Sequence, residues 1–542
     1  MDAPSGKVPI DHAPHSRTVV LMVDPLPPLI QALLSADCYP HPVAGVELVE
    51  THGAWVLLAG DFAYKIKKPV RFPFMDFSTL AARRRACETE VRINRRFQIH
   101  DQPATQLYLG VLPLTGSPEQ PRWGHSGGED DALAIEFAVQ MRRFDERLRL
   151  DHLCERGALT PDHIRSLARR MAAFQARAAV AASQHPWGHP AAAMRWPRDN
   201  FQTLTAALPG ATEATLVHQL RDWTEERFGS IEALLARRRQ KGRVREGHGD
   251  LHLANLILVD GEVLPFDGIE FNEELRWIDV ANDMAFAWMD LLHQQQPGLA
   301  NLLMSEWLDV SGDVSAPAVW GFFASYRAGV RAKVAAIRMG QLEGQGPSTD
   351  AEACHHEARQ YLQLANDISR PPAPQLLITH GLSGCGKTWA SSRWLQAEST
   401  GRAIRLRSDV ERKRLRGMGP LTPSGSGLNA DLYSAQSHHD TYASLLARAR
   451  NLLHDGWSVL VDAAFLRASE RQAFAALAQA AQCPFHILAP TAPVKELRAR
   501  IRARQAERAD ASEATLEVLA HQLVWLEPLT QNERAVLLTA PG

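Results

Sequence analysis

The sequence predicts an N-terminal domain of mixed α+β type and a C-terminal α/β domain with a parallel sheet. Three observations carry this prediction. A glycine-rich loop at 381–388 follows an apolar strand and opens a helix, strands and helices alternate after it, and proline interrupts the chain at 370–374. Adjacent prolines stop a helix, so 370–374 is the expected linker. We expect domains at 26–369 and 375–542, preceded by a loose tail at 1–25.

The composition is that of an ordinary folded protein. Of 542 residues, 45% are hydrophobic and 22% are charged, and 59 Lys and Arg nearly balance 61 Asp and Glu. This excludes a disordered or collagen-like chain and gives no basic field that would favour nucleic acid. The six cysteines are scattered, so neither a disulfide framework nor a zinc site is expected. Without a long apolar run or a signal-peptide pattern, we expect a cytoplasmic protein with no membrane partner and no obligate protein partner.

The N-terminal domain begins with strands around one long helix. Residues 55–68 predict two short strands that turn at Gly60-Asp61, and residues 77–97 predict the helix, with Ser78 or Thr79 as its N-cap. Two further strands flank a surface hairpin loop. After residue 148 the pattern is mainly helical as far as 369, with one hairpin that turns at Asp260-Gly261. The strands are expected at 106–115 and 132–141, and the loop at 116–131.

The strand at 62–68 carries candidate nucleotide lysines. Lys65 and Lys67 are expected on one strand face, because strand side chains alternate. Either lysine fits the spacing that phosphoryl-transfer enzymes of the protein-kinase type use, and the choice between them stays open. Glu90 is the best ion-pair partner on the following helix, with Glu88 second. The alternative is a solvated basic strand.

A His-Gly-Asp loop is the first catalytic motif. Residues 248–255 contain H-G-D-x-x-x-x-N, and Asp267 follows beyond the hairpin. Phosphoryl transfer of the protein-kinase type uses one Asp to orient and deprotonate a hydroxyl, an Asn five residues on to hold metal, and a later Asp for Mg²⁺. Asp250, Asn255 and Asp267 stand in that order. The alternative is a loop rich in His and Asp that makes structural hydrogen bonds.

This block resembles the aminoglycoside phosphotransferase and choline kinase superfamily, which uses H-G-D in this loop. The resemblance implies a bilobal, protein-kinase-like domain in which Asp250 is the catalytic base and Asn255 and Asp267 hold Mg²⁺. It also implies that the strand at 134–141 offers backbone groups to adenine. A glycine-rich loop of the G-x-G-x-x-G type is absent from this sequence.

The second motif is a phosphate-binding loop. Residues 381–388 fit G-x-x-x-x-G-K-[ST] after the apolar strand 376–379. Glycines let backbone N–H groups point at phosphate oxygens, the lysine supplies charge to the β- and γ-phosphates, and the threonine hydroxyl binds Mg²⁺. The candidate residues are Gly381, Ser383, Gly384, Cys385, Gly386, Lys387 and Thr388.

One further residue completes this nucleotide site, and two further features point beyond nucleotide binding alone. Asp462 ends a second apolar strand and is the candidate Mg²⁺ carboxylate, unless it only caps a turn. Asp409 and Arg412 stand at D-x-x-R spacing. Asp409 is the candidate base that takes a proton from the acceptor hydroxyl, and Arg412 is the candidate phosphate contact. The alternative is that Asp409 caps a solvated basic helix. Arg500 and Arg504 share one face of an Arg-rich helix at 497–512, which suits a lid over the phosphates or a solvated helix.

Residues 374–542 resemble the small P-loop kinases of the polynucleotide kinase and zeta-toxin type, often described as AAA-type ATP-binding domains. The resemblance implies that Asp409 is the general base and that Arg500 and Arg504 stabilise the transferring group. Taken whole, the chain resembles a bacterial family of bifunctional aminoglycoside phosphotransferase and ATP-binding proteins. That family description does not identify the substrate.

These motifs predict an ATP- and Mg²⁺-dependent phosphotransferase with two nucleotide sites. The expected acceptor is a hydroxyl of a small molecule or of a nucleotide or nucleic-acid end. One alternative makes the C-terminal domain a regulatory switch that hydrolyses ATP. Another makes one of the two domains an inactive binding module.

Overall fold

The computed structural model describes residues 26–72, 75–99, 101–344, 348–420, 422, 434–507 and 515–538, so the expected tail at 1–25 lies outside it. The chain forms two compact units. The first comprises Met1–Asp145 with Phe266–Asn272, and the second comprises Glu146–Pro265 with Glu273–Gly542. This division differs from the expected boundary at 370–374, which stays a prediction. Within the described ranges, every helix is too short or too polar to cross a membrane.

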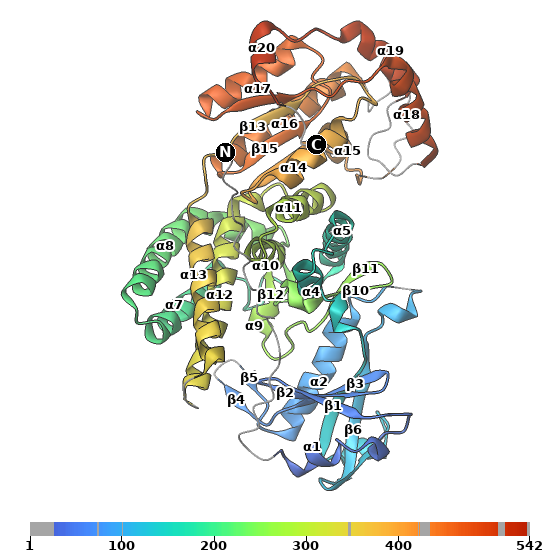
Figure 1. Cartoon of the computed structure of the whole chain (residues 1–542), viewed down its shortest axis with the longest axis vertical. Helices are drawn as coiled ribbons and strands as arrows, with labels where there is room; N and C mark the ends of the chain where they lie inside the picture. The colour runs from blue at the N-terminus through green and yellow to red at the C-terminus, as the bar shows by residue number, and fades with distance from the viewer. Residues whose placement is uncertain are drawn as a thin grey trace, which may run out of the picture. The chain divides into compact units, whose positions relative to one another are not determined.

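The first unit is built on an antiparallel sheet of order β1-β2-β3-β8-β6-β7 (Figure 1). Alternation along β3 places Tyr64 and Ile66 in a core with α1, while Lys65 and Lys67 face α2. The expected strands and long helix are confirmed, and the Thr79 hydroxyl caps α2 by accepting from Ala82 N. The expected loop at 116–131 contains a strand and a short helix. The elements are α1 (Pro28–Ala32), β1 (Val46–Glu50), β2 (Ala54–Ala59), β3 (Phe62–Lys67), β4 (Arg71–Phe72), β5 (Met75–Asp76), α2 (Leu80–Arg95), β6 (Tyr108–Ser117), β7 (Gln120–Trp123), α3 (Glu129–Ala132) and β8 (Glu136–Arg142).

The second unit begins with a helical part. Helices α10 and α11 are buried along most of their length and lie at its centre. The hairpin expected around Asp260-Gly261 is β10 and β11, and the expected end of the helical stretch at 369 is the end of α13. The elements are α4 (Leu150–Glu155), α5 (Pro161–Arg177), α6 (Pro190–Ala193), α7 (Arg195–Ala207), α8 (Ala211–Gln240), β9 (Val244–Glu246), β10 (Leu256–Val259), β11 (Glu262–Pro265), α9 (Glu273–Arg276), β12 (Trp277–Asp279), α10 (Val280–His293), α11 (Pro297–Ser311), α12 (Pro317–Glu343) and α13 (Thr349–Ser369).

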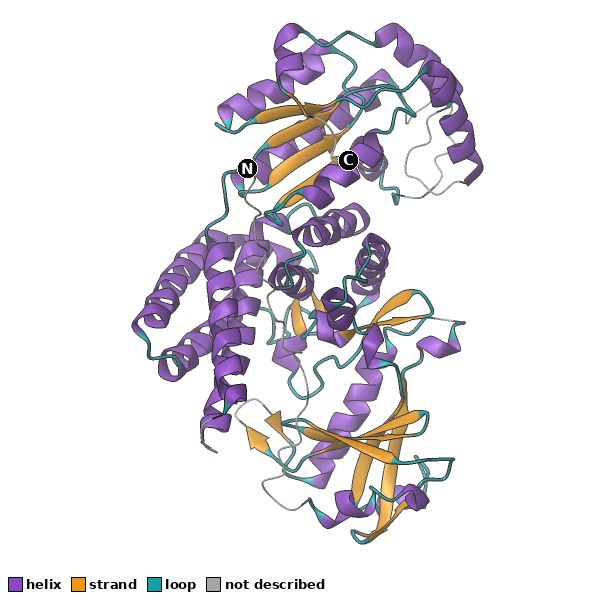
Figure 2. Ribbon diagram, viewed as in Figure 1, coloured by secondary structure: helices purple, strands orange, loops and turns teal. Residues whose placement is uncertain are grey.

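The rest of the second unit is a parallel sheet of order β14-β15-β13-β16-β17, with helices packed around it (Figure 2). β13 is its central strand, and β13 and its neighbour β15 are buried along their whole length. The expected fold class, a kinase-like bilobal part followed by an α/β P-loop part, is confirmed. The elements are β13 (Leu376–Thr379), α14 (Lys387–Ala397), β14 (Ala403–Arg407), α15 (Ser408–Leu415), α16 (Ala435–His454), β15 (Ser458–Asp462), α17 (Ala468–Ala480), β16 (Phe485–Leu488), α18 (Val494–Glu507), α19 (Leu516–Trp525), α20 (Gln531–Ala535) and β17 (Leu537–Leu538).

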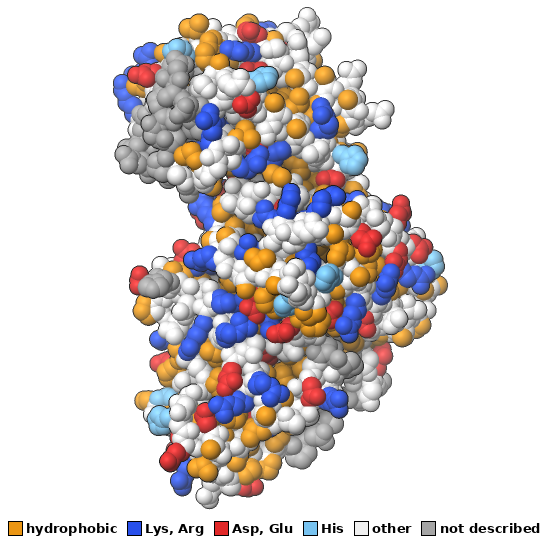
Figure 3. Space-filling model, turned by 180° about the vertical axis from the view of Figure 1, so that it is seen from behind, with side chains coloured by type: hydrophobic (Ala, Val, Ile, Leu, Met, Phe, Trp, Pro, Cys, Tyr) orange, Lys and Arg blue, Asp and Glu red, His pale blue; other side chains and the backbone are white. Residues whose placement is uncertain are grey.

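The described surface mixes both signs of charge. Lys and Arg side chains lie among Asp and Glu side chains over the face shown in Figure 3. This agrees with the net charge of −2 of the whole sequence.

Candidate active sites

The first unit holds a cluster of buried charges between β3 and α2. The Lys65 ammonium contacts Glu90 Oε1 at 2.8 Å and Asp267 Oδ1 at 2.5 Å. Lys67 contacts the other oxygen of Glu90 at 2.5 Å and also pairs with Glu270. Both lysines therefore face Glu90, as expected, but only Lys65 contacts the candidate metal carboxylate. The second-choice partner Glu88 pairs with Arg84 on the exposed side of α2 instead.

Electrostatics keeps both lysines charged. Burial lowers the pKa of Lys65, but Asp267 and Glu90 outweigh it and raise that pKa well above its usual value. Glu270 and Glu90 likewise raise the pKa of Lys67 against the effect of burial. Glu270 was not foreseen from the sequence. The only indication of Glu270 in the sequence is that it stands three residues after Asp267.

Backbone contacts hold the Asp267 segment in place. Asp267 has a left-handed φ of 59°, which is uncommon for a residue other than glycine. Its N–H donates to the Tyr108 hydroxyl at 3.0 Å, and the N–H of Gly268 donates to Asn94 Oδ1 at 2.9 Å. The Asp267 side chain is 44% exposed, so its carboxylate can bind a cation while the backbone behind it is fixed.

The His-Gly-Asp loop is shaped by a carboxylate of α10. Asp283 accepts hydrogen bonds from His248 N and Gly249 N, both at 2.8 Å. A Cβ on Gly247 would lie 2.2 Å from Asp283 Oδ2, so only glycine allows this approach. The Arg327 guanidinium donates to Gly249 O at 2.8 Å from α12. Asp283 thus positions the loop through its backbone.

Asp250 and Asn255 meet at the mouth of this loop. The Asn255 amide donates to Asp250 O and to Asp250 Oδ2, both at 3.0 Å. Burial raises the pKa of the Asp250 carboxyl, but the His252 ring 3.4 Å away outweighs it and, with His248, holds that pKa well below its usual value. Asp250 is therefore a carboxylate at neutral pH. It lies in the second unit and Asp267 in the first, so their approach to one metal ion stays a prediction.

The phosphate-binding loop follows β13 and opens α14, as expected. Gly386 has a φ of 98° and stands at the N-cap of α14, where the left-handed backbone requires glycine. The Lys387 ammonium lies inside the loop and donates to Gly381 O and Leu382 O, both at 2.9 Å. Cys385 is buried in an apolar cluster with α18 and α19. Its side chain therefore points away from the loop's anion-binding face.

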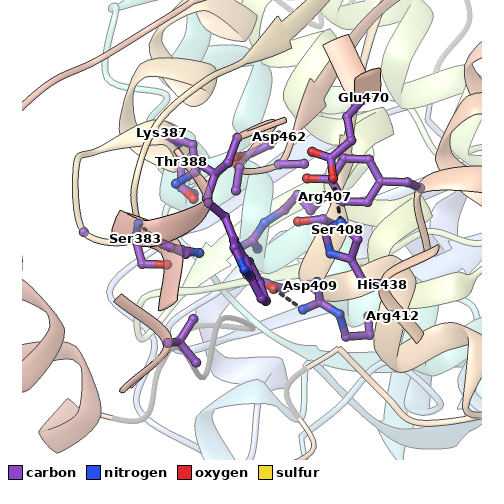
Figure 4. Close-up of a pocket in the computed structure, with 18 of the residues that line it drawn as sticks. Ser383, Lys387, Thr388, Arg407, Ser408, Asp409, Arg412, His438, Asp462 and Glu470 are labelled. Atoms are coloured by element: carbon purple, nitrogen blue, oxygen red, sulfur yellow. Dashed lines mark hydrogen bonds and ion pairs between the residues drawn. The ribbon is translucent and has the colours of Figure 1, made fainter. Parts of the chain in front are cut away.

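A cavity of about 420 Å³ opens beside this loop (Figure 4). Lys387, Thr388 and Asp462 line one end, and Asp409 and Arg412 lie across from them. The pocket lies at the carboxyl ends of β13, β14 and β15, where open parallel sheets bind ligands.

Two carboxylates of this pocket have different partners. The Asp462 carboxylate accepts from the Ser391 hydroxyl at 3.1 Å, and Asp462 ends β15 as expected. Asp409 lies in the first turn of α15 and pairs with Arg412 at 2.8 Å. One carboxylate thus accepts from a serine of α14, and the other pairs with a guanidinium.

The remaining wall comes from helices that follow the sheet. Arg500 of α18 lines the pocket and donates to Gly384 O at 3.2 Å. The Arg504 side chain lies outside the described residues. The Gln522 side chain accepts from Ser383 N at 2.7 Å, a loop amide that could otherwise bind phosphate. Nothing in the sequence pattern around Gln522 indicates this contact.

Further pocket residues were not expected from the sequence. His438 Nε2 lies 2.7 Å from Glu470 Oε1 across the pocket, and Arg407 and Trp389 line its walls. Arg407 stands two residues before Asp409 of the D-x-x-R segment, which is the one signal that could have indicated it. Among the described residues, no three His, Cys, Asp or Glu side chains converge on one point. A cation at this site would therefore rely on the Thr388 hydroxyl, Asp462, water and the phosphates themselves.

Relatives place the chain in a family. Uncharacterized protein Rv2004c of Mycobacterium tuberculosis is 32% identical over 498 residues, which is 90% of this chain and 93% of that protein. Uncharacterized protein Mb2027c of Mycobacterium bovis matches to the same extent. The chain belongs to the same family as these mycobacterial proteins. Residues 376–529 of this family member also match the model of the AAA domain.

Solved structures with partial likeness cover each part. An APS kinase of Mycobacterium tuberculosis in complex with AMPPNP and APS is 21% identical and covers 31% of this chain and 90% of its own, with a TM-score of 0.24. A choline/ethanolamine kinase family protein from Mesorhizobium loti is 11% identical and covers 62% and 90%, with a TM-score of 0.35. An aminoglycoside phosphotransferase from Alicyclobacillus acidocaldarius is 15% identical and covers 61% and 91%, with a TM-score of 0.34.

Proposed function

We propose that this protein is an ATP- and Mg²⁺-dependent phosphotransferase that moves the γ-phosphoryl group to a hydroxyl of a small molecule or of a nucleotide or nucleic-acid end. The observation that carries the proposal is the pocket in which Lys387, Thr388 and Asp462 face Asp409 and Arg412. A site that only binds ATP needs the first three. A carboxylate across the pocket adds a group that can take a proton from an acceptor.

The C-terminal site supplies position and charge. The loop amides and Lys387 would hold the β- and γ-phosphates, and Arg500 lies where it would contact the transferring group. The Thr388 hydroxyl and the Asp462 carboxylate are oxygen donors of the kind Mg²⁺ prefers. Bound there, Mg²⁺ would neutralise charge on the phosphate oxygens. Asp409 would accept the proton of the attacking hydroxyl, once an acceptor displaces its contact with Arg412.

The second proposed site uses the kinase-like part of the chain. Lys65, held by Glu90, would contact the nucleotide phosphates, and Asp267 and Asn255 would hold Mg²⁺. Asp250 would act as the base, since its depressed pKa keeps the carboxyl ionised at neutral pH and the Asn255 amide holds its carboxylate.

ATP turnover by the full chain tests both sites. Lys387→Ala should remove ATP turnover by the C-terminal site and leave turnover that requires Asp250. Asp250→Ala should do the reverse. Each variant is assayed with Mg²⁺, with and without a panel of small hydroxyl compounds and 5′-hydroxyl oligonucleotides. ADP release that depends on an acceptor would support the proposal. Lys387-dependent release without any acceptor would favour the regulatory switch, and turnover unaffected by either substitution would contradict both sites.

A further inference from the structure

Helix α11 of the helical part lies along an edge of the P-loop sheet. β14 is an edge strand of that sheet, since it pairs with β15 alone. Edge strands leave every second backbone N–H without a partner strand. β14 matters to the site, because Arg407 at its end and Asp409 just after it line the pocket.

Polar side chains of α11 accept these edge N–H groups in register. Asn301 Oδ1 accepts from Ala403 N at 2.7 Å, and Ser305 Oγ accepts from Arg405 N at 3.1 Å. Four helical residues rise about 6 Å and two strand residues rise about 6.6 Å, so a helix parallel to a strand can match it at this interval. The next member of the α11 series is Asp309.

Asp309, the next residue of α11 at this interval, interacts with β14 electrostatically. Burial raises its pKa to about 6, and Arg407 is the foremost of the positive groups that oppose this rise. Arg407 is also the next alternate residue of β14 after Arg405. The hydrogen-bonded series itself joins Asn301 to Ala403 and Ser305 to Arg405, and Arg407 is the next alternate residue of the strand.

The contact between α11 and the P-loop helix α14 is equally close. A Cβ on Gly298 would lie 1.9 Å from Gln396 O, so the two backbones touch at the first turn of α11. The Asn301 amide donates to Leu395 O at 3.1 Å and to Glu398 Oε2 at 3.0 Å. Asn301 thus binds the end of α14 and the start of β14 together.

A charged link joins α11 to the helix that carries the phosphate-binding loop. Glu306 pairs with the Arg405 guanidinium at 3.1 Å, and Arg405 also donates to the Ser392 hydroxyl on α14 at 2.6 Å. The neighbouring Ser391 hydroxyl donates to Asp462. Arg405 is 3% exposed, so removal of Glu306 would leave a buried charge without its carboxylate partner.

We propose that α11 completes the P-loop site, with Asn301 and Ser305 acting as positioning residues that set β14 and thereby Asp409. The inference rests on the proposed function of that site. It means that the helical part and the P-loop part are not independent modules joined by a linker. Hydrogen bonds from one part determine where the acceptor-side carboxylate of the other part lies.

The test compares two buried serines in the full chain. Ser305→Ala removes the acceptor of the Arg405 N–H. Ser325→Ala is the matched control, because the Ser325 hydroxyl is also buried and donates to one backbone carbonyl, Ala365 O, within the helical part. Both are made in an Asp250→Ala chain, so that the remaining ATP turnover reports the P-loop site.

Two readouts separate positioning from general stability. Ser305→Ala should raise hydrogen exchange at the 403–407 amides about tenfold and lower kcat about tenfold, with KM for ATP unchanged because the phosphate-binding loop keeps its contacts. Ser325→Ala should change neither. Wild-type kcat and wild-type exchange in Ser305→Ala would overturn the inference.

Failure of the proposed function would have a different signature. If Lys387→Ala leaves turnover unchanged in the Asp250→Ala chain, the proposed site is wrong, and hydrogen exchange at 403–407 still decides whether α11 holds β14. If Ser305→Ala does not fold, Glu306→Gln replaces it, since it keeps the side-chain size and removes the negative charge that pairs with Arg405. Its expected result is the same fall in kcat without a change in KM for ATP, and wild-type kcat would overturn the inference.

Discussion

Replacing the two lysines of β3 one at a time should separate a nucleotide contact from a structural one. Lys65→Met and Lys67→Met each remove a charge and keep a side chain of similar length. Both lysines contact Glu90, but their second partners differ. Lys65 reaches Asp267, which is 44% exposed, and Lys67 reaches Glu270, which is 7% exposed.

The burial of each partner sets the expected loss of stability. Lys67 is 2% exposed and Glu270 is 7% exposed, so Lys67→Met removes a buried partner from Glu270, while Glu90 keeps Lys65. Breaking a buried ion pair costs about 3–5 kcal/mol in the free energy of unfolding. In Lys65→Met, Glu90 keeps Lys67 and Asp267 can be hydrated, so the expected cost is about 1 kcal/mol.

The expected effects on catalysis run in the opposite order. In the proposed function Lys65 contacts phosphate beside Asp267, so Lys65→Met should lower kcat of the kinase-like site about 100-fold or more. Lys67→Met should keep most of its kcat at temperatures where it remains folded.

Urea unfolding and ATP turnover in a Lys387→Ala chain measure the two effects. Lys68→Met is the matched control on the same strand end, because Lys68 pairs with Glu50 at a more exposed site. It should cost less than about 1 kcal/mol and leave kcat unchanged. If Lys67→Met loses turnover while Lys65→Met loses stability, or if both substitutions have equal effects, the assignment of the two lysines is refuted.

Three further predictions concern the second unit. Gly298→Ala should destabilise the fold by about 1–3 kcal/mol, because its Cβ would meet Gln396 O. The control Gly229→Ala has open space around its Cβ and should stabilise the fold by about 1 kcal/mol. Chemical denaturation compares the two variants, and equal shifts in the free energy of unfolding would contradict the close contact. Asp283→Ala should lower kcat of the kinase-like site more than tenfold with little change in KM for ATP, because the N–H groups of His248 and Gly249 lose the carboxylate that accepts from them. An unchanged kcat would show that the loop holds its shape without Asp283. Burial raises the pKa of Asp309 to about 6, so its protonated form favours the folded state below about pH 4 and this contribution is lost as pH rises through 6. Asp309→Asn should therefore gain stability relative to wild type between pH 4 and pH 7, by at most about 3 kcal/mol, and a difference that does not vary with pH would contradict the shift.

Local sequence patterns predicted most of the elements that carry chemistry. The loop at 381–388 was placed between a strand and a helix because its glycines, apolar strand and following helix are consecutive in the chain. Thr79 was one of two expected caps, and the hydrogen bond to Ala82 N selects it. The H-G-D-x-x-x-x-N spacing puts Asp250 and Asn255 in one loop, and the structure joins the two side chains by a hydrogen bond.

Partners distant in sequence could not be predicted in the same way. The choice between Lys65 and Lys67 depends on where Asp267 and Glu270 lie, some 200 residues later in the chain. Gln522 reaches Ser383 N from a helix whose sequence carries no sign of this contact. Such pairings depend on how distant segments pack together, and no fixed interval between two residues in the sequence indicates them.

The sequence by itself determined the two motifs, the order of strands and helices and the fold class, because these follow from residue spacing and turn chemistry over short stretches. Tertiary structure alone decided which lysine meets the candidate metal carboxylate and that α11 lies against β14. The proline-rich segment predicts a linker between two domains. The sequence around it gives no sign that backbone N–H groups of an edge strand meet side chains of a helix about 100 residues earlier, because a buried N–H can find its acceptor far away in the chain.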